Sequence, residues 1–370
     1  MTRLAFRNLF QNKARLVISV GGVALALLLI LTLDAIFAGA ERRVTAYIDS
    51  SASDIIVAQS GVRNMHMASS SLPDSVRRKV GAVPGVRAVL PIDYVASNVV
   101  IGDERNLAYV IGLPEDAAFG GAWQVASGRS LPAEGEAIID RGIAEKSAIA
   151  LGDEVEILGK DFQIAGFSEG TSSLVNSVAF ISANDFEELR RSYGTFSFLL
   201  VQVQRGESAS LVVERIHSQV RDVTAQTTPD FAAQERRVIR DMSTDVIAIM
   251  NVIGFLIGLA VMALTVYTSA LARRREYGML KAFGARNLDL SKTVVMQAFL
   301  SVVIGYAFGL GVTLLLALVV PRLGSNLTLE VTTASLMKVG VGSLVIASVA
   351  ALAPIRQIAG LPPAMVFRGA

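Results

Sequence analysis

The fold is decided by an uncharged stretch near the start of the chain, LVISVGGVALALLLILTL, residues 16–33. Its only polar side chains are those of Ser19 and Thr32. A run of this length is close to the minimum for a helix that crosses a hydrocarbon core of roughly 30 Å. We therefore interpret residues 16–39 as a first transmembrane helix.

Three later apolar runs predict three more transmembrane helices, at residues 246–271, 293–320 and 335–355. The 370-residue chain is 52% hydrophobic and 18% charged, whereas soluble domains carry about 25% charged residues. No run has a charged residue at its centre, where one would mark an ion or proton path, so an ion-coupled transporter is disfavoured. Small residues spaced four apart indicate close helix packing, although glycine is also simply common in membrane helices. These residues are Gly254 with Gly258 and Gly305 with Gly309, and Gly311 follows two positions later.

The distribution of basic residues sets the expected orientation. The segment 272–292 contains six Lys or Arg residues and two acidic ones, and basic residues also precede the first run. Because Lys and Arg are enriched in cytoplasmic loops, we expect both termini and segment 272–292 inside and the residues 40–245 and 321–334 outside. Residues 1–15 alternate apolar and basic side chains, which predicts an amphipathic helix on the inner surface of the membrane. Residues 356–370 are expected to form a cytoplasmic tail. The family resemblance described below implies that this membrane is the bacterial inner membrane.

A cleaved signal peptide is the alternative for the N-terminus, because Ala38-Gly39-Ala40 resembles a cleavage site. The first apolar run is longer than the usual 7–15 residues of a signal sequence. The later runs also give a consistent topology with an uncleaved first helix, which we therefore prefer.

Residues 40–245 have the pattern of an α/β domain. Period-2 alternation and β-branched residues predict strands, and capped helical patterns predict helices between them. The predicted strands are 54–58, 86–91, 94–101, 107–112, 135–139, 155–158, 162–167, 178–181 and 198–203, with a hairpin turn at 159–161. The predicted helices are 73–82, 143–148, 183–193 and 207–220. A further helix, 232–243, runs into the second transmembrane helix and predicts a stalk.

The residue inventory excludes several chemistries. The chain has no cysteine and two histidines, which excludes disulfides and a Cys/His zinc site. It has no nucleotide-binding P-loop and no hydrolase or metalloprotease motif, so a membrane-anchored enzyme is disfavoured and ATP is not expected to bind. The segment Met65-His66-Met67 could bind copper, but a flexible exposed loop is the preferred interpretation, and His217 is expected on the surface. A formal charge of +2 gives no reason to expect nucleic acid.

The segment RRREYGMLKAFG, residues 273–284, is followed by Ala285 and Arg286. It predicts a short cytoplasmic helix that ends at Gly284, because glycine adopts the left-handed conformation that closes helices. Tyr277, Met279, Leu280 and Phe283 are expected to present apolar surface. From the residues alone, a stop-transfer cluster with interfacial anchors explains the segment equally well.

Over its whole length the chain resembles the FtsX/MacB-type permeases of ABC transporters, also called the type VII or mechanotransmission class. The segment resembles their R-x-R-E-I-G-x-x-x-A-x-G-A loop, with Tyr277 where isoleucine is commoner. Further matching features are A-F-R-N-L at 5–9, N-K-A-R at 12–15, P-G-V at 84–86, G-R at 128–129, a hairpin within 151–166, and P-I-R-Q-I-A at 354–359 with P-P-A at 362–364.

The resemblance implies a permease with four transmembrane helices and a MacB-like extracytoplasmic domain, without an enzyme activity of its own. ATP and Mg²⁺ are expected on a separate ABC ATPase, which docks beneath the segment. Homodimers or heterodimers with a similar permease, a periplasmic adaptor and membrane lipid are the further implied partners. The implied ATPase-coupling residues are Arg275, Glu276, Tyr277, Gly278, Met279, Leu280, Lys281, Phe283, Gly284, Ala285 and Arg286.

Two functions fit this resemblance. The first is export or extraction of a lipid, lipoprotein, peptide or drug, driven by movement of the extracytoplasmic domain. The second is FtsX-like signalling, in which the extracytoplasmic domain activates a cell-wall hydrolase. Both share one topology, so the sequence leaves the choice and the substrate open.

Overall fold

The computed structural model describes residues 13–102, 104–171, 177–323 and 327–359. They divide into two compact units. The helical unit is drawn from Met1–Ala38, Ser243–Arg322 and Leu329–Ala370, and the α/β domain from Gly39–Met242 and Leu323–Thr328. The predicted N-terminal amphipathic helix up to residue 12 and the tail from residue 360 lie outside the described residues.

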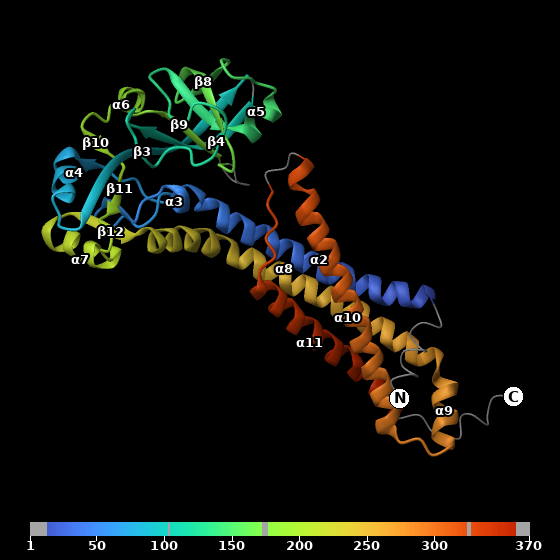
Figure 1. Ribbon diagram of the computed structural model, residues 1–370. Helices are drawn as coiled ribbons and strands as arrows, with labels where there is room; N and C mark the ends of the chain where they lie inside the picture. The colour runs from blue at the N-terminus through green and yellow to red at the C-terminus, as the bar shows by residue number, and fades with distance from the viewer. Residues whose placement is uncertain (1–12, 103, 172–176, 324–326, 360–370) are drawn as a thin grey trace. The chain divides into compact units, whose positions relative to one another are not determined.

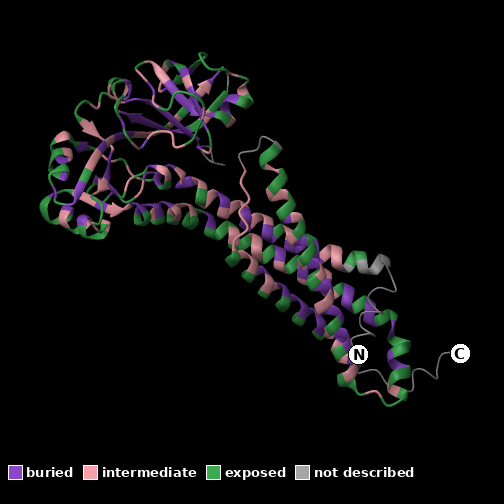
Figure 2. Ribbon diagram, in the orientation of Figure 1, coloured by how far each residue is buried: buried purple, intermediate pink, exposed green. Residues whose placement is uncertain are grey.

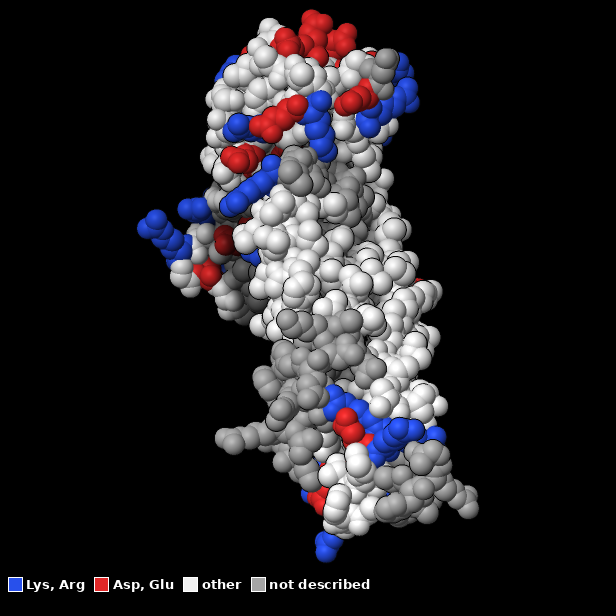
Figure 3. Space-filling view, turned by 90° about the vertical axis from the view of Figure 1, so that its right-hand side faces the viewer, with Lys and Arg blue, Asp and Glu red and all other residues white. Residues whose placement is uncertain are grey.

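The helical unit contains four long apolar helices, which confirms the predicted four transmembrane helices. They are α2 (Lys13–Val44), α8 (Thr228–Ala272), α10 (Asn287–Val319) and α11 (Thr333–Ala359), with a 3₁₀ helix, η1 (Pro321–Leu323), after α10. Each is long and apolar enough to span a membrane. The face drawn in Figure 3 shows a long uncharged surface on this unit. Pro354 lies inside α11, and the helix continues to Ala359, beyond the expected end at residue 355.

Glycines bring the helices of this unit close together. A Cβ on Gly22 would lie 2.2 Å from Cγ1 of Val261, and one on Gly254 would lie 2.6 Å from Cγ1 of Ile30. On α10, a Cβ on Gly305 or Gly309 would lie 3.1 Å from the nearest atom of α2. The predicted small-residue packing is therefore confirmed at Gly254, Gly258, Gly305 and Gly309, but Gly311 faces open space. Gly22 was not predicted.

Two polar contacts lie among the apolar side chains of the helical unit. The amide of Gln297 on α10 donates to the hydroxyl of Ser269 on α8 at 3.0 Å. Asp34 on α2 is buried and pairs with Lys338 on α11 at 2.5 Å. Both pairs satisfy polar groups that would be costly to leave alone in hydrocarbon.

The α/β domain is built on one ten-stranded sheet with the order β12-β1-β11-β3-β4-β9-β6-β8-β5, and β7 pairs with β3 and β8. A separate two-stranded ladder joins β2 and β10. The strands are β1 (Ile55–Gln59), β2 (Leu72–Pro73), β3 (Val86–Ile101), β4 (Glu104–Leu113), β5 (Val125–Gly128), β6 (Glu136–Asp140), β7 (Glu154–Ile157), β8 (Lys160–Ser168), β9 (Ser177–Ser182), β10 (Thr195–Phe196), β11 (Phe198–Val203) and β12 (Val223–Thr227). The helices are α3 (Ala46–Ser50), α4 (Asp74–Gly81), α5 (Arg141–Ser147), α6 (Ala183–Arg190) and α7 (Ala209–Gln219).

The long strand β3 joins two halves of this sheet (Figure 1). Its first half pairs with β11 as far as Ile92, and its second half pairs with β4 from Asp93 onward. We predicted two strands with a break between Pro91 and Tyr94, and this was wrong. The half of β3 that contains Pro91 pairs with β11 on one edge. Proline has no N–H, and it is tolerated in a strand that has a free edge to which that N–H would have pointed.

The β7–β8 hairpin also differs in detail from the prediction. Its two turn residues are Leu158 and Gly159, with φ of 55° and 83°, and the adjacent pair is Ile157 with Lys160. Two positive φ angles match the right-handed twist of the flanking strands. Lys160 and Asp161, which we placed in the turn, therefore already belong to β8.

Aromatic side chains fill the centre of the domain, where the strands are largely buried (Figure 2). Phe162, Phe180, Phe198 and Phe231 are all less than 2% exposed. Phe231 lies on α8 and packs at a ring distance of 6.0 Å on Phe198 of β11. The first turns of α8 therefore belong to the core of the domain.

Polar bonds tie the same part of α8 to the end of α2 and its surroundings. Arg240 pairs with Glu41 at 2.8 Å, and Arg236 donates to Thr45 at 3.0 Å. The buried carboxylate of Glu235 accepts from the backbone N–H of Met65 at 2.8 Å. From these residues, α8 continues without interruption to Ala272, as the sequence predicted for segment 232–243 and the run that follows it.

Candidate coupling site

The predicted segment forms helix α9 (Arg274–Ala282), which follows α8 after a bend at Arg273. The backbone N–H of Tyr277 bonds to the carbonyl of Arg273 at 3.0 Å, so the first turn is closed. The Arg273 side chain is buried and pairs with Glu276 at 3.5 Å. An arginine held in this way fixes the start of α9.

The end of α9 is closed by the predicted glycine. Gly284 has φ of +89°. Its N–H bonds to the carbonyl of Lys281 at 3.0 Å, and the N–H of Ala285 bonds to that of Leu280 at 2.9 Å. This pair of bonds is the Schellman motif, which satisfies the last carbonyls of a helix. The chain then enters α10 with Arg286 at its N-cap position.

One face of α9 is anchored in the helical unit. Tyr277 is 3% exposed and belongs to the same buried cluster as Leu290 and Val294 of α10. Gly278 beside it is buried as well. Burial raises the pKa of the Tyr277 phenol, which therefore stays protonated. We expected Tyr277 on the apolar surface, but the structure places it inside, because its ring fills the space beside α10.

Elsewhere on α9 and its C-terminal turn, large apolar side chains are exposed. Phe283 is 89% exposed, Met279 44% and Leu280 39%. Leu288, in the first turn of α10, adds a fourth such residue. Leu288 was not predicted from the sequence because it lies outside the long apolar run, although an isolated leucine between the polar Asn287 and Asp289 indicates an exposed apolar residue.

Charged side chains surround these apolar residues. Arg275, Glu276 and Arg286 are exposed, and Lys281 and Ala285 are half-buried. The predicted residues are therefore brought together on one helix and its C-terminal turn. An exposed phenylalanine among arginines fits a protein-docking surface, because aromatic residues and arginine dominate the energetics of protein interfaces.

The other candidate from the sequence, His66, is placed differently from expectation. It lies in a loop of the α/β domain but contacts Glu235 and Tyr109. Among the described residues no group of three or more His, Asp or Glu side chains could hold a metal ion. Neither α9 nor this loop has the arrangement of a metal site. His217 is exposed, as expected, and its Nε2 accepts from the N–H of Ala225 at 2.9 Å.

Comparison with known proteins agrees with this architecture. Residues 16–219 match the MacB-like periplasmic core domain, and residues 248–363 match the FtsX-like permease C-terminal domain. The chain therefore belongs to the ABC transporter permeases of the MacB/FtsX type. An ABC transporter permease implies an ATPase partner.

Several relatives extend over most of the chain. An uncharacterized ABC transporter permease of Mycobacterium tuberculosis is 23% identical over 370 residues, which is 99% of each chain. The pyoverdine export ATP-binding/permease protein PvdT of Pseudomonas syringae pv. tomato is 24% identical over 390 residues, which covers 97% of this chain and 58% of PvdT. The crystallised periplasmic region of MacB from Actinobacillus actinomycetemcomitans has 12% sequence identity and a TM-score of 0.39, over 52% of this chain and 97% of that one.

Proposed function

We propose that this permease couples ATP hydrolysis by a separate ABC ATPase to movement of its α/β domain, with α9 as the docking element. The observation that carries the proposal is Phe283, an 89% exposed aromatic side chain on a helix whose other face is buried. A monomeric soluble surface has little reason to hold such a group, whereas a docking surface does. The arginines around it provide the polar rim of an interface.

The docking side is proposed to be cytoplasmic. The six basic residues of segment 272–292 favour that side, as the positive-inside rule predicts. On this assignment both termini are cytoplasmic, the α/β domain is extracytoplasmic, and the membrane is the bacterial inner membrane.

Helix α8 is the proposed route by which motion reaches the α/β domain. It is a single helix of 45 residues, about 68 Å long at 1.5 Å per residue. Its first turns are held by Glu235, Arg236 and Arg240, and its last residue directly precedes the bend into α9. A displacement of α9 therefore acts on an element that is also part of the domain core.

The assembly and the cargo are further parts of the proposal. We propose a homodimer, or a heterodimer with a similar permease, and two ATPase copies that carry the ATP and Mg²⁺. A periplasmic adaptor is a candidate partner. PvdT is named for pyoverdine export, which favours export or extraction over signalling to a cell-wall hydrolase. A lipid, lipoprotein, peptide or drug are the proposed classes of cargo.

The test is Phe283→Asp in the full chain, co-expressed with a candidate partner ABC ATPase and reconstituted in nanodiscs. We expect co-purification of the ATPase and its permease-stimulated ATP hydrolysis to fall at least tenfold, because the substitution puts a charge at the centre of the interface. Tyr193→Asp is the matched control, since Tyr193 is 67% exposed but lies in the α/β domain. Equal stimulation by wild type and Phe283→Asp would refute the assignment of α9.

The two functions are separated by a second measurement. A cell-wall hydrolase that binds the full chain in an ATP-dependent way would support signalling. Release of labelled cargo from the membrane in the presence of ATP would support export or extraction.

A further inference from the structure

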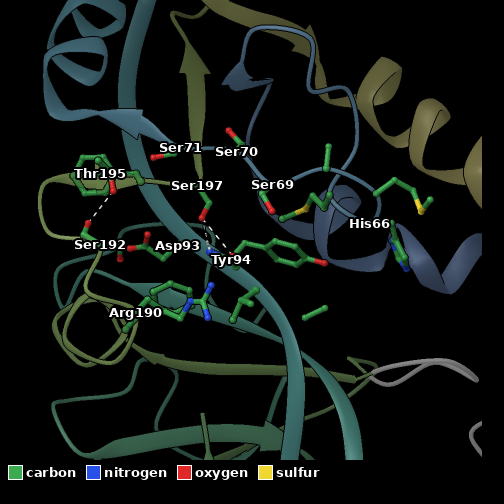
Figure 4. A pocket seen from close by; sticks show the side chains of 17 residues that line it. His66, Ser69, Ser70, Ser71, Asp93, Tyr94, Arg190, Ser192, Thr195 and Ser197 are labelled. Carbon is green, nitrogen blue, oxygen red and sulfur yellow. Dashed lines mark hydrogen bonds between the residues drawn. The ribbon is translucent and has the colours of Figure 1, made fainter.

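The α/β domain contains a cavity of about 410 Å³ that the coupling role does not use (Figure 4). Its wall is formed by the loop 65–71, the middle of β3, the end of α6 and the segment 192–197. This volume lies within the range of about 300–1,000 Å³ that is usual for small-molecule sites.

The cavity lies where β3 changes its ladder partner. Phe198 of β11 pairs with Ile92, and the ladder to β4 begins at Asp93. Ser197, the residue before β11, adds one more bond on this edge of β3, because its hydroxyl accepts from the N–H of Tyr94 at 3.0 Å. The preceding strand, β10, pairs with β2 and not with β3. Among the described residues, this edge of β3 near Asp93 therefore has no strand beside it.

Space for the Asp93 side chain is provided from the other side by a glycine. Gly112 pairs with Asp93 across the β3–β4 ladder. A Cβ on Gly112 would lie 3.0 Å from the Cβ of Asp93 and 2.8 Å from that of Phe186. The absent side chain lets Phe186 pack tightly and keeps Asp93 beside the cavity.

Three polar atoms of this wall lack a hydrogen-bond partner among the described residues. They are Oδ2 of Asp93, the hydroxyl of Tyr94 and Oγ of Ser192, and each is buried. Asp93 as a whole is only 2% exposed. Buried polar groups are almost always paired, so the unpaired atoms of Asp93 and Ser192 indicate that something else supplies their partners. The Tyr94 hydroxyl points to the other side of β3, toward His66 (Figure 4).

Asp93 is the buried acidic side chain of the cavity wall. Burial and the negative charge of Glu187 raise the pKa of Asp93 to about 7, against a backbone hydrogen bond from Ser197. Arg190 also lines the cavity, but it is exposed and no ion pair joins it to Asp93 in the described structure. A cation bound beside Asp93 would offset both the burial of the carboxylate and its repulsion by Glu187.

The rest of the wall is suited to an apolar body. Phe186, Phe196 and Val95 line the cavity together with Met65 and Met67. Aromatic and methionine side chains adapt well to a small organic group. A ligand that satisfies the whole site therefore combines an N–H-bearing cationic end with an apolar remainder.

We propose that this cavity binds a small organic cation, a protonated primary amine on an apolar body, whose ammonium group donates to Asp93. This site is distinct from α9, and its occupancy is measured without an ATPase. Its failure would therefore leave the coupling proposal untouched.

The test uses the full chain in phosphatidylcholine nanodiscs at pH 8, with ¹⁹F NMR titration of three probes and empty nanodiscs as blank. The probes are 4-fluorophenethylamine, the neutral 2-(4-fluorophenyl)ethanol and the anionic 3-(4-fluorophenyl)propanoate. We expect the amine to bind at least tenfold more tightly than the alcohol or the acid. Similar affinities for the amine and the alcohol, or no amine binding, would overturn the proposal.

Two variants locate the site. Asp93→Asn should lose at least tenfold in amine affinity and leave the affinity for the alcohol unchanged. Glu214→Gln is the matched control, because Glu214 is an exposed acid on α7 and does not line the cavity. Amine binding that survives Asp93→Asn unchanged would show that the amine is held elsewhere. The comparison of probes on the wild type needs no variant, so the proposal stays testable if Asp93→Asn folds poorly.

Discussion

Replacement of Asp93 by asparagine should make the α/β domain more stable at alkaline pH, even though it removes a side chain that we assign to ligand binding. In the folded protein the pKa of Asp93 is about 7, whereas its ordinary value is 3.8. The folded state thus binds the proton more tightly than the unfolded state. Ionisation of this carboxyl therefore costs stability, and the cost grows as the pH rises from about 4 to 7.

The magnitude follows from the difference of about three pKa units. At about 1.4 kcal/mol per unit, the wild type loses about 4 kcal/mol of unfolding free energy between pH 4 and pH 8 through this group. Asparagine has no proton to lose, so this part of the pH dependence disappears in the variant. The unfolding free energy of the variant, measured relative to that of the wild type, should therefore rise by about 4 kcal/mol from pH 4 to pH 8. Other carboxylates titrate in both proteins and cancel in the difference.

The assay uses Trp123, the one tryptophan of the chain, which lies in the α/β domain next to Tyr47 at a ring distance of 6.4 Å. Its fluorescence reports urea unfolding of that domain in the full chain. The slope of unfolding free energy against urea is about 2 kcal/mol per molar. The urea midpoint of the variant, relative to that of the wild type, should therefore be about 2 M higher at pH 8 than at pH 4. A difference between variant and wild type that stays constant within about 1 kcal/mol from pH 4 to 8 would refute the raised pKa.

Two further predictions concern the same domain. Gly166→Ala on β8 should cost about 2 kcal/mol or more in the urea assay, because the new Cβ would lie 2.3 Å from the carbonyl oxygen of Arg129. Gly81→Ala, whose Cβ would meet nothing closer than 3.9 Å, should leave the midpoint within about 0.5 M, and a similar loss in both would contradict the steric argument. Glu235→Ala should expose the loop that contains His66 to proteolysis at least tenfold faster, since Glu235 anchors that loop. Unchanged cleavage, followed by mass spectrometry, would show that the loop is held by other contacts.

The sequence was sufficient for the features that rest on local chemistry. Long uncharged runs predict membrane helices because no soluble fold needs them, and Gly284 predicts the end of α9 because its conformation excludes most other residues. The continuity of α8 followed from an unbroken helical pattern across residue 245. These predictions depend on neighbours in the sequence and not on distant partners.

Features that depend on distant partners could not be predicted in this way. The run around Ile92 and Asp93 has a proline and an acid, which indicate a turn, yet the ladders to β11 and β4 hold it as one strand. Asp93 was therefore missed as a site residue, because its burial results from Gly112 and Phe186 on other elements. Tyr277 was placed on the wrong face for a similar reason, since its burial requires Leu290 of α10.

The turn that follows α9 has a kinetic consequence for the docking proposed there. Phe283 projects from a main chain whose N–H groups at residues 283, 284 and 285 are all bonded back into the helix. A docking partner therefore meets a preorganised backbone and has to immobilise only side chains, which keeps the entropic cost of association small. The rate of encounter with such a surface is then set by diffusion and by the surrounding arginine charges, and not by a slow folding step of the permease.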